Sequence, residues 1–198
     1  MFARQPLWVP LATHSPAFAE RFLAFSRASP HTRRLLEGVT YRPEETRVLL
    51  APDARVAGRR VTHAMAFPLT VTAAVCEAGE DGGAMSGGAF ASLLDATTSV
   101  HVMERLLPSS DAHVSVNMQS RCLRPIRRGD TLVLISRVEK MGARLAFMSA
   151  ELLRDRPGES ATSAAEAPAT SIAEMDSFLR RFELLASGKH VKFLIRSK

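Results

Sequence analysis

The chain has 198 residues, 46% of them hydrophobic, and a formal net charge of +6, which is typical of one globular domain with a full core plus extensions. No apolar run approaches the ~20 residues that span a bilayer, no cleavable secretory pattern opens the chain, and basic residues are not interleaved with aromatic ones. We therefore expect an intracellular protein, cytoplasmic or mitochondrial, with no nucleic-acid partner and no stable membrane association.

Residues 1–45 are predicted to form a helical extension before the main domain. A helical stretch with Phe18, Phe22 and Phe25 on one apolar face ends near Gly38. The segment is rich in arginine and poor in acidic residues. That composition suits a mitochondrial targeting peptide, and it equally suits a helix packed on the outside of a core.

Strands are predicted next. Three segments rich in Val, Thr and Leu, residues 46–51, 59–67 and 69–76, favour extended structure, and Pro52 and Pro68 interrupt them. A loop rich in glycine and acidic residues follows.

One long helix is predicted from Gly88 to about Leu107, where apolar residues recur at helical spacing and proline is absent. Asp95 lies inside this otherwise small and apolar run. Because burial of an unpaired carboxylate costs several kcal/mol of desolvation, such a residue is either paired or retained for chemistry.

After the predicted helix, the spacing of apolar residues changes from a helical period to alternation at every second residue. In "HVSVNMQ", residues 113–119, Val114, Val116 and Met118 alternate with Ser115, Asn117 and Gln119, which predicts a strand with one polar face. Segments 131–140 and 143–154 flank a Met-Gly hairpin signal, and an alanine-rich strand, or alternatively a flexible loop, is expected over 161–173.

The order of these segments predicts an α+β fold in which one helix packs against one curved antiparallel sheet, with a meander after the helix. Residues 176–198 are expected to be a basic tail that covers exposed core or, alternatively, contacts an anionic membrane surface.

Cysteines and histidines give no metal-ligand or triad spacing, so no metal site is expected. Cys76 and Cys122 lie in apolar, strand-like surroundings and are interpreted as reduced packing residues. His63, His101 and His113 are interpreted as structural.

"GGAFASLLD", residues 87–95, together with residues 113–152, resembles the hotdog-fold acyl-CoA thioesterases of the phenylacetate-degradation and 4-hydroxybenzoyl-CoA thioesterase superfamily. The resemblance covers about residues 46–175 and leaves 1–45 and 176–198 outside. It implies a curved antiparallel sheet wrapped around one long central helix, a homodimer with one continuous sheet, and dimers that can stack into homotetramers. It also implies hydrolysis of acyl-CoA thioesters to free acid and CoA in lipid metabolism, with CoA as part of the substrate and no cofactor.

The resemblance also implies site residues. Asp95 falls at the catalytic carboxylate, and Ser115 at a strand residue that helps to hold the attacking water. The family's His-Gly-Gly at the helix start is here Ser86, Gly87 and Gly88. An asparagine that many members carry six residues earlier is also replaced, by Glu80, which Asp81 follows.

Physical chemistry gives an independent reason to consider this helix. A thioester needs a donor at its developing oxyanion, and a helix N-terminus supplies free N–H groups, here at Gly87 and Gly88. Eight residues separate Gly87 from Asp95, which is about 12 Å along a helix, so the two cannot meet on one carbon. Two antiparallel helices would place the glycines of one chain beside the aspartate of its partner, giving two equivalent sites in a dimer.

In that arrangement Asp95 acts as general base on water or attacks the thioester directly, and the sequence leaves both routes open. Ser115 with Thr97 or Thr98 would orient the water, and Ser86 either takes the place of the histidine or only caps the helix. Arginines are expected to bind the CoA phosphates. The expected substrate-binding residues are Gly88, Thr98, Asn117, Arg121, Arg124, Arg127 and Arg128.

Two other functions compete with hydrolysis. The missing histidine and asparagine are compatible with a non-catalytic acyl- or CoA-binding protein or scaffold of the same fold. Enoyl-CoA hydration would require an aspartate–histidine pair, and no histidine follows Gly87 within ten residues.

Overall fold

The computed structural model describes residues 8–41, 43–56, 58–79, 83–109, 111–154 and 172–196. Seven strands form one antiparallel sheet in the order β1-β2-β3-β5-β6-β7-β4. The strands are β1 Trp8–Pro10, β2 Arg47–Val56, β3 Arg59–Thr70, β4 Ala112–Cys122, β5 Thr131–Met141, β6 Leu145–Arg154 and β7 Glu183–Ile195. The helices are α1 Leu11–His14, α2 Pro16–Ala28, α3 Pro30–Gly38, α4 Gly87–Leu106 and α5 Ile172–Leu179, with short 3-10 turns η1 Pro43–Glu45 and η2 Ala73–Val75.

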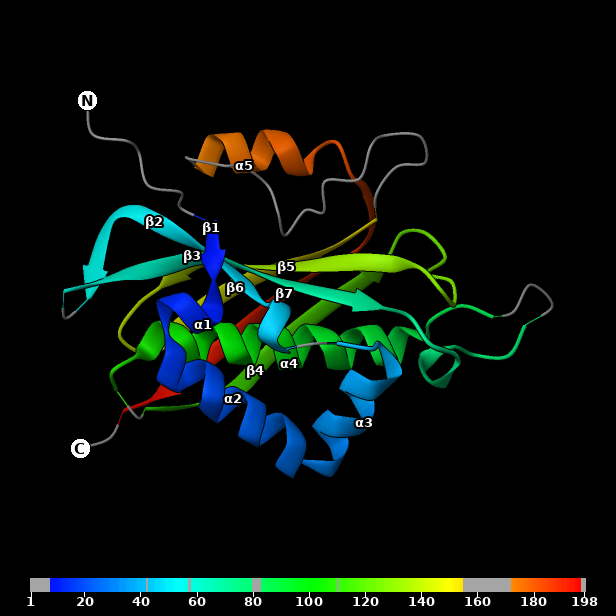
Figure 1. The fold of residues 1–198 in the computed structure, drawn as a ribbon, viewed down its shortest axis with the longest axis horizontal. Helices are drawn as coiled ribbons and strands as arrows, with labels where there is room; N and C mark the ends of the chain where they lie inside the picture. Colours follow the sequence, from blue (N-terminus) through cyan, green and yellow to red (C-terminus); the bar gives the residue numbers. More distant parts are fainter. Residues whose placement is uncertain are drawn as a thin grey trace.

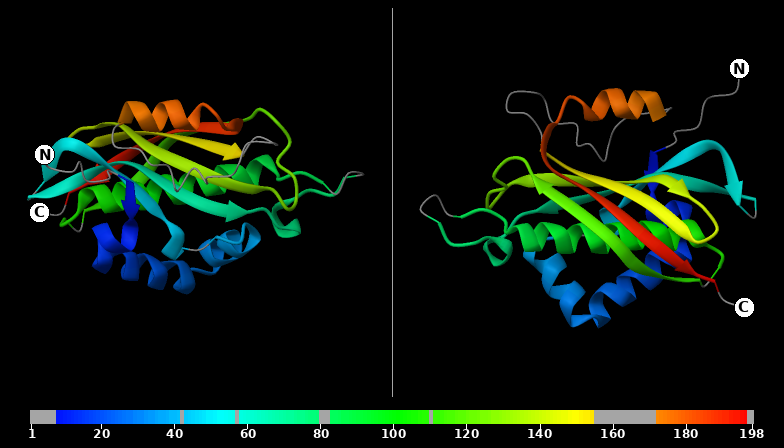
Figure 2. Two further views of the ribbon diagram at one scale, coloured as in Figure 1. Left: turned by 45° about the horizontal axis from the view of Figure 1, so that its top comes forward. Right: turned by 180° about the vertical axis from the view of Figure 1, so that it is seen from behind.

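The elements are arranged in layers around α4. The curved sheet wraps one side of α4, and α1, α2 and α3 cover the other side (Figure 1). The two further views in Figure 2 show α5 on the outer face of the sheet, away from α4. The expected architecture, a curved antiparallel sheet around one long helix, is confirmed.

Helix α4 forms for local reasons. Ser86 is its N-cap, and the Ser86 hydroxyl accepts a hydrogen bond from the Ala89 N–H at 3.0 Å. Phe90, Leu93 and Leu94 recur at helical spacing and are buried in the main core. The predicted span, Gly88 to about Leu107, is thus confirmed to within one residue at each end.

The N-terminal segment packs over α4, and a buried carboxylate helps to hold it there. Glu104 near the end of α4 is fully buried. It accepts hydrogen bonds from the hydroxyls of Ser15 at 3.1 Å and Thr62 at 2.5 Å. Phe18 and Phe22 are buried in the core, as a packed helix requires, whereas the side chain of Phe25 is outside the described part.

The predicted break at Pro68 is wrong, because β3 continues through it to Thr70. Strand β2 stops pairing with β3 at Ala66, so in the described chain β5 is the strand neighbour at Pro68. A proline is tolerated there because its missing N–H faces no second strand. Residues 73–75, predicted to be extended, form η2.

The connectivity after α4 also differs from the predicted meander. Strand β4 pairs with β7 and does not pair with β5 in the described residues. The C-terminal segment expected to be a tail, residues 176–198, contains the end of α5 and all of β7, and β7 lies inside the sheet between β6 and β4. Of the strand expected over 161–173, residues 161–171 lie outside the described part, and the residues from 172 on begin α5.

Candidate active site

Asp95 is paired, although it is not deeply buried. Its side chain on α4 is 50% exposed, and the Lys192 ammonium from β7 lies 3.0 Å from its Oδ1. The Ser115 hydroxyl from β4 donates to the same oxygen at 3.0 Å, and the Ser99 hydroxyl one helical turn along α4 does so at 3.5 Å. The carboxylate therefore gathers donors from three elements.

These donors determine the ionisation of Asp95. Burial by itself raises the pKa of Asp95, but the hydrogen bond and charge of Lys192, with the Ser115 hydrogen bond, outweigh it and leave the pKa below its usual value. The carboxyl group is thus ionised at neutral pH.

Lys192 is the least expected member of the site, because its side chain is fully buried. The ammonium donates to the Ser99 hydroxyl at 2.7 Å and to the Ser115 hydroxyl at 3.3 Å, in addition to Asp95. Burial lowers the pKa of Lys192, while the hydrogen bond and charge of Asp95 oppose this effect. The lysine charge therefore depends on the aspartate.

His190, two residues earlier on β7, completes the surroundings of Asp95. Its Nδ1 lies 2.8 Å from the Thr98 hydroxyl, and its Nε2 lies 3.7 Å from Asp95 Oδ1. Burial, followed by the Lys192 charge, lowers the pKa of His190 to about 4, so the ring is neutral at physiological pH. Within the described ranges His190 Nε2 has no hydrogen-bond partner.

The two oxygens of Asp95 differ in their surroundings. Lys192, Ser115, Ser99 and His190 all approach Oδ1. Among the residues that the structure describes, none makes a hydrogen bond or ion pair to Oδ2. One oxygen is therefore anchored, while the other is available to a ligand.

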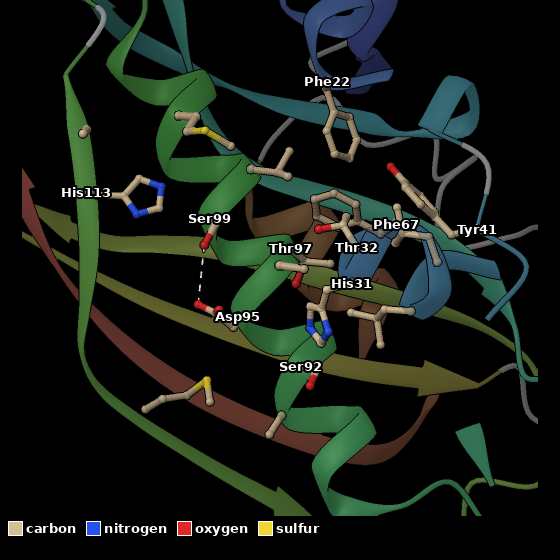
Figure 3. Close-up of a pocket in the computed structure, with 18 of the residues that line it drawn as sticks. Phe22, His31, Thr32, Tyr41, Phe67, Ser92, Asp95, Thr97, Ser99 and His113 are labelled. Carbon is tan, nitrogen blue, oxygen red and sulfur yellow. Dashed lines mark hydrogen bonds between the residues drawn. The ribbon is translucent and has the colours of Figure 1, made fainter. Parts of the chain in front are cut away.

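Asp95 stands at the rim of a cavity of about 500 Å³ between α4 and the N-terminal helices. Figure 3 shows Asp95, Ser99 and His113 together on one flank of α4. His113 is partly buried, and burial lowers the pKa of its ring. Its Nδ1 has no hydrogen-bond partner in the described chain.

The helix start is open. Gly87 and Gly88 are exposed, and a Cβ added to Gly87 would meet no atom within 4 Å. Gly87 and Asp95 lie on the same straight helix, as expected, so a single chain does not bring them to one point. Ser86, whose hydroxyl caps the helix, matches the capping interpretation.

The remaining predicted residues are not all near the site. Thr98 is fully buried, and its hydroxyl contacts the Leu94 carbonyl at 2.7 Å and His190, so it positions that ring and does not line the cavity. Thr97 does line the cavity. Arg121, Arg124, Arg127 and Arg128 are exposed at and beyond the end of β4, and Arg124 pairs with Glu183 at 3.1 Å.

A β-bulge changes the predicted faces of β4. Ser115 pairs with Lys192 and Asn117 pairs with Val191, so Val116 is an extra residue between them. Because side chains alternate along β7, Asn117 lies on the outer face with Val191, away from Asp95. The prediction that Ser115 and Asn117 share one face is therefore wrong.

Lys192 and His190 were missed because the segment looked like a basic tail. The sequence does carry a short signal, because the polar His190 and Lys192 alternate with the apolar Val191 and Phe193. Such alternation indicates a strand with polar groups on one face, and in the structure His190 and Lys192 are buried.

The structure also describes the two cysteines and His101. Cys76 and Cys122 are free, as expected, but Cys122 is exposed and so is not a packing residue. No group of metal-binding side chains occurs among the described residues, and no helix there is long and apolar enough to cross a bilayer. His101 is buried beside the Ser136 hydroxyl at 3.0 Å, consistent with a structural role. Glu80 and Asp81 lie outside the described part.

Comparison with known proteins agrees with this architecture. Residues 82–161 match the family model described as the thioesterase superfamily, whereas no curated protein matches the chain. The solved structure of thioesterase superfamily member 2 from Mus musculus is similar, with a TM-score of 0.54, 20% identity, and coverage of 90% of this chain and 96% of that chain. The solved structure of zebra fish thioesterase superfamily member 2 has a TM-score of 0.56 and 19% identity, with coverage of 90% of this chain and 96% of that chain. The structure of the E. coli PaaI protein from the phenylacetic acid degradation operon has a TM-score of 0.55 and 13% identity, with coverage of 92% of this chain and 96% of that chain.

The fold is thus the hotdog fold of these thioesterases. The resemblance inferred from the sequence is confirmed, since the superfamily match contains both the start of α4 and Asp95.

Proposed function

We propose that the protein hydrolyses acyl-CoA thioesters to the free acid and CoA. The observation that carries this proposal is the state of Asp95: an ionised carboxylate with Oδ1 fixed by Lys192 and Ser115, and with Oδ2 free at the rim of a cavity. A thioester carbonyl carbon placed beside Oδ2 has a base or nucleophile at hand.

Two routes use this geometry. As general base, Oδ2 takes a proton from water, which attacks the carbonyl carbon and expels the CoA thiolate. As nucleophile, Oδ2 attacks the same carbon, expels the thiolate and forms an anhydride that water then opens. A single turnover in heavy-oxygen water detects the nucleophilic route when water opens the anhydride at the Asp95 carbonyl carbon. The first product acid then carries an oxygen from the protein, whereas the general-base route gives an acid that carries a water oxygen.

The oxyanion requires donors that Asp95 cannot supply within its own chain. The free N–H groups at Gly87 and Gly88 are suited to this role, with the favourable end of the α4 dipole behind them. Since these glycines lie about 12 Å along the helix from Asp95, they serve the site of a partner chain. The proposed enzyme is therefore a dimer with two shared sites.

The exposed edge of the sheet supports the dimer. Strand β4 is at one end of the strand order. Val114, Val116 and Met118 on it are 49%, 60% and 40% exposed, which is unusual for large apolar side chains. Antiparallel pairing of β4 with a second β4 would cover this edge and set the two α4 helices side by side. The arginines beyond β4 would then lie near the entrance for the CoA phosphates.

The test measures CoA release from acetyl-, octanoyl-, dodecanoyl- and phenylacetyl-CoA with a thiol-trapping dye. We expect turnover by the native chain and a loss of at least about a hundredfold in kcat for Asp95→Asn. Because Asp95→Asn leaves the Lys192 ammonium without its counter-charge, Asp95→Asn/Lys192→Met is the matched control for folding. Binding of these thioesters without CoA release would contradict hydrolysis and favour the alternative, a non-catalytic acyl- or CoA-binding protein.

A further inference from the structure

The cavity beside Asp95 is built partly from residues that precede the segment matched by the thioesterase family model. Helices α2 and α3 and the turn after them form one wall, and α4 and β4 form the other. Its apolar lining includes Phe22, Leu35 and Tyr41 on the first wall, Val100 and Met103 on the second, and Phe67 of β3. The matched segment begins at residue 82, so the N-terminal wall lies outside the family model's match.

This wall is held in place. The ring centroids of Phe22 and Tyr41 are 6.2 Å apart, and those of Tyr41 and Phe67 are 5.9 Å apart, which ties α2 to the core of the sheet. The Tyr41 hydroxyl forms a hydrogen bond with Thr46. Upstream, Ser15 is bonded to the buried Glu104 on α4. The wall is therefore preformed, as ligand cavities usually are.

The two ends of the cavity differ in chemistry. Figure 3 shows Asp95, Ser99 and His113 on one flank of α4, and Phe22, Tyr41 and Phe67 on the other flank. The α4 side chains that line the middle of the cavity include Ala91, Ser92 and Ala96, which are small. A chain that starts at Asp95 can thus cross α4 beneath α3 and end among aromatic rings.

We propose that the acyl group of the substrate occupies this cavity, and that α2 and α3 set the acyl length that the enzyme accepts. This inference rests on the proposed thioester hydrolysis. It assigns acyl-chain specificity to Phe22 and Tyr41 at the far end and to Leu35 on the α3 wall, whereas Asp95 performs the chemistry at the near end.

The cavity also limits the class of acyl group. About 500 Å³, at about 30 Å³ for each water-sized group, holds about seventeen non-hydrogen atoms. A dodecanoyl group fills most of this space, an octanoyl group about half of it and an acetyl group little of it, whereas a stearoyl group exceeds it.

The test compares Leu35→Trp with Arg34→Trp. Leu35 lines the cavity, whereas the adjacent Arg34 is exposed on the same helix and does not. The probe is the dodecyl thioether of CoA, which cannot be hydrolysed, and calorimetry measures its affinity beside that of free CoA. We expect Leu35→Trp to weaken the thioether at least about tenfold relative to free CoA, because the new ring excludes several methylene groups. Arg34→Trp should match the native chain.

A second variant guards against a folding defect in the first. Phe22→Leu shortens the far wall, so the optimum acyl length for CoA release should move from dodecanoyl toward stearoyl, with thermal unfolding as the check on folding. The inference would be overturned if both Leu35→Trp and Phe22→Leu bound the thioether with native affinity. It would also be overturned if the variants changed CoA release from acetyl-CoA and dodecanoyl-CoA by the same factor. Tight thioether binding by a native chain that releases no CoA would instead refute hydrolysis and leave the cavity assignment standing.

Discussion

Asp95 and Lys192 form an ion pair whose partners differ sharply in exposure, so removing one should not cost the same as removing the other. The Lys192 side chain is 0% exposed and the Asp95 side chain 50%. Asp95→Asn leaves a buried ammonium without its counter-charge, which costs about 3–5 kcal/mol in the free energy of unfolding. Lys192→Met leaves a carboxylate that water still reaches, so we expect a loss of about 1 kcal/mol, as for a solvent-screened pair.

The double variant Asp95→Asn/Lys192→Met retains neither charge and should recover about 2 kcal/mol relative to Asp95→Asn. For a domain of this size each kcal/mol corresponds to about 2–4 °C in Tm. Asp95→Asn should therefore melt at least about 6 °C below the native chain, and the double variant at least about 4 °C above Asp95→Asn. Thermal and urea unfolding at neutral pH give both values. Equal losses for the two single variants would refute the reasoning.

The pH dependence provides a second check on the same pair. In Asp95→Asn the pKa of Lys192 falls further, because the carboxylate no longer opposes the effect of burial. Between that lowered pKa and the ordinary lysine value of about 10.4, the unfolded chain binds more protons, so stability rises with pH. The deficit of Asp95→Asn relative to the double variant should shrink from neutral to alkaline pH. A deficit that grows with pH would contradict a buried ammonium.

Three further variants test other parts of the account. Gly87→Ala should leave Tm unchanged or raised, since its Cβ meets nothing within 4 Å. It should lower kcat/KM at least about tenfold, because the new methyl group blocks the oxyanion donor. Full activity of this variant would show that the helix start is not part of the site. Gly188→Ala should lose about 1–3 kcal/mol in the free energy of unfolding measured with urea, because its Cβ would lie 2.3 Å from Leu94 Cδ2. Native stability of this variant would mean that α4 and β7 pack more loosely than this distance implies. Glu104→Ala should lose about 2–4 kcal/mol in the free energy of unfolding, because it removes the buried carboxylate that accepts from the Ser15 and Thr62 hydroxyls. Limited proteolysis should then cut the N-terminal helices faster; unchanged cleavage would show that Glu104 does not hold them.

The parts of the fold that were predicted correctly depend on local patterns. Helix α4 shows a helical period along its length, residues 113–119 of β4 alternate between apolar and polar, and the β5–β6 hairpin has its Met-Gly signal. Asp95 was recognised because a carboxylate inside a small, apolar helical run needs an explanation, and its pairing with Ser115 agrees with that expectation.

The parts that were missed depend on pairing between distant segments. Nothing local in β4 shows that its neighbour is β7, and the bulge at Val116 is visible only in the register with Lys192. The lysine itself lies 97 positions from Asp95 in the chain. A basic, apolar C-terminal segment gave no reason to place an ammonium against the candidate catalytic carboxylate, although its alternation was typical of a strand.

Whether each site combines Asp95 of one chain with the helix start of another is tested most directly by combining two variants that each impair catalysis. Chains carrying Asp95→Asn/Lys192→Met and chains carrying Gly87→Ala are co-expressed with different tags, and CoA release is measured on the purified mixed dimer. If the sites are shared, one of the two sites in each mixed dimer has lost both groups and the other keeps both, so we expect about half of native activity. If each site lies within one chain, every site in the mixed dimer keeps one defect, and activity no higher than that of the two variants measured separately would contradict the account.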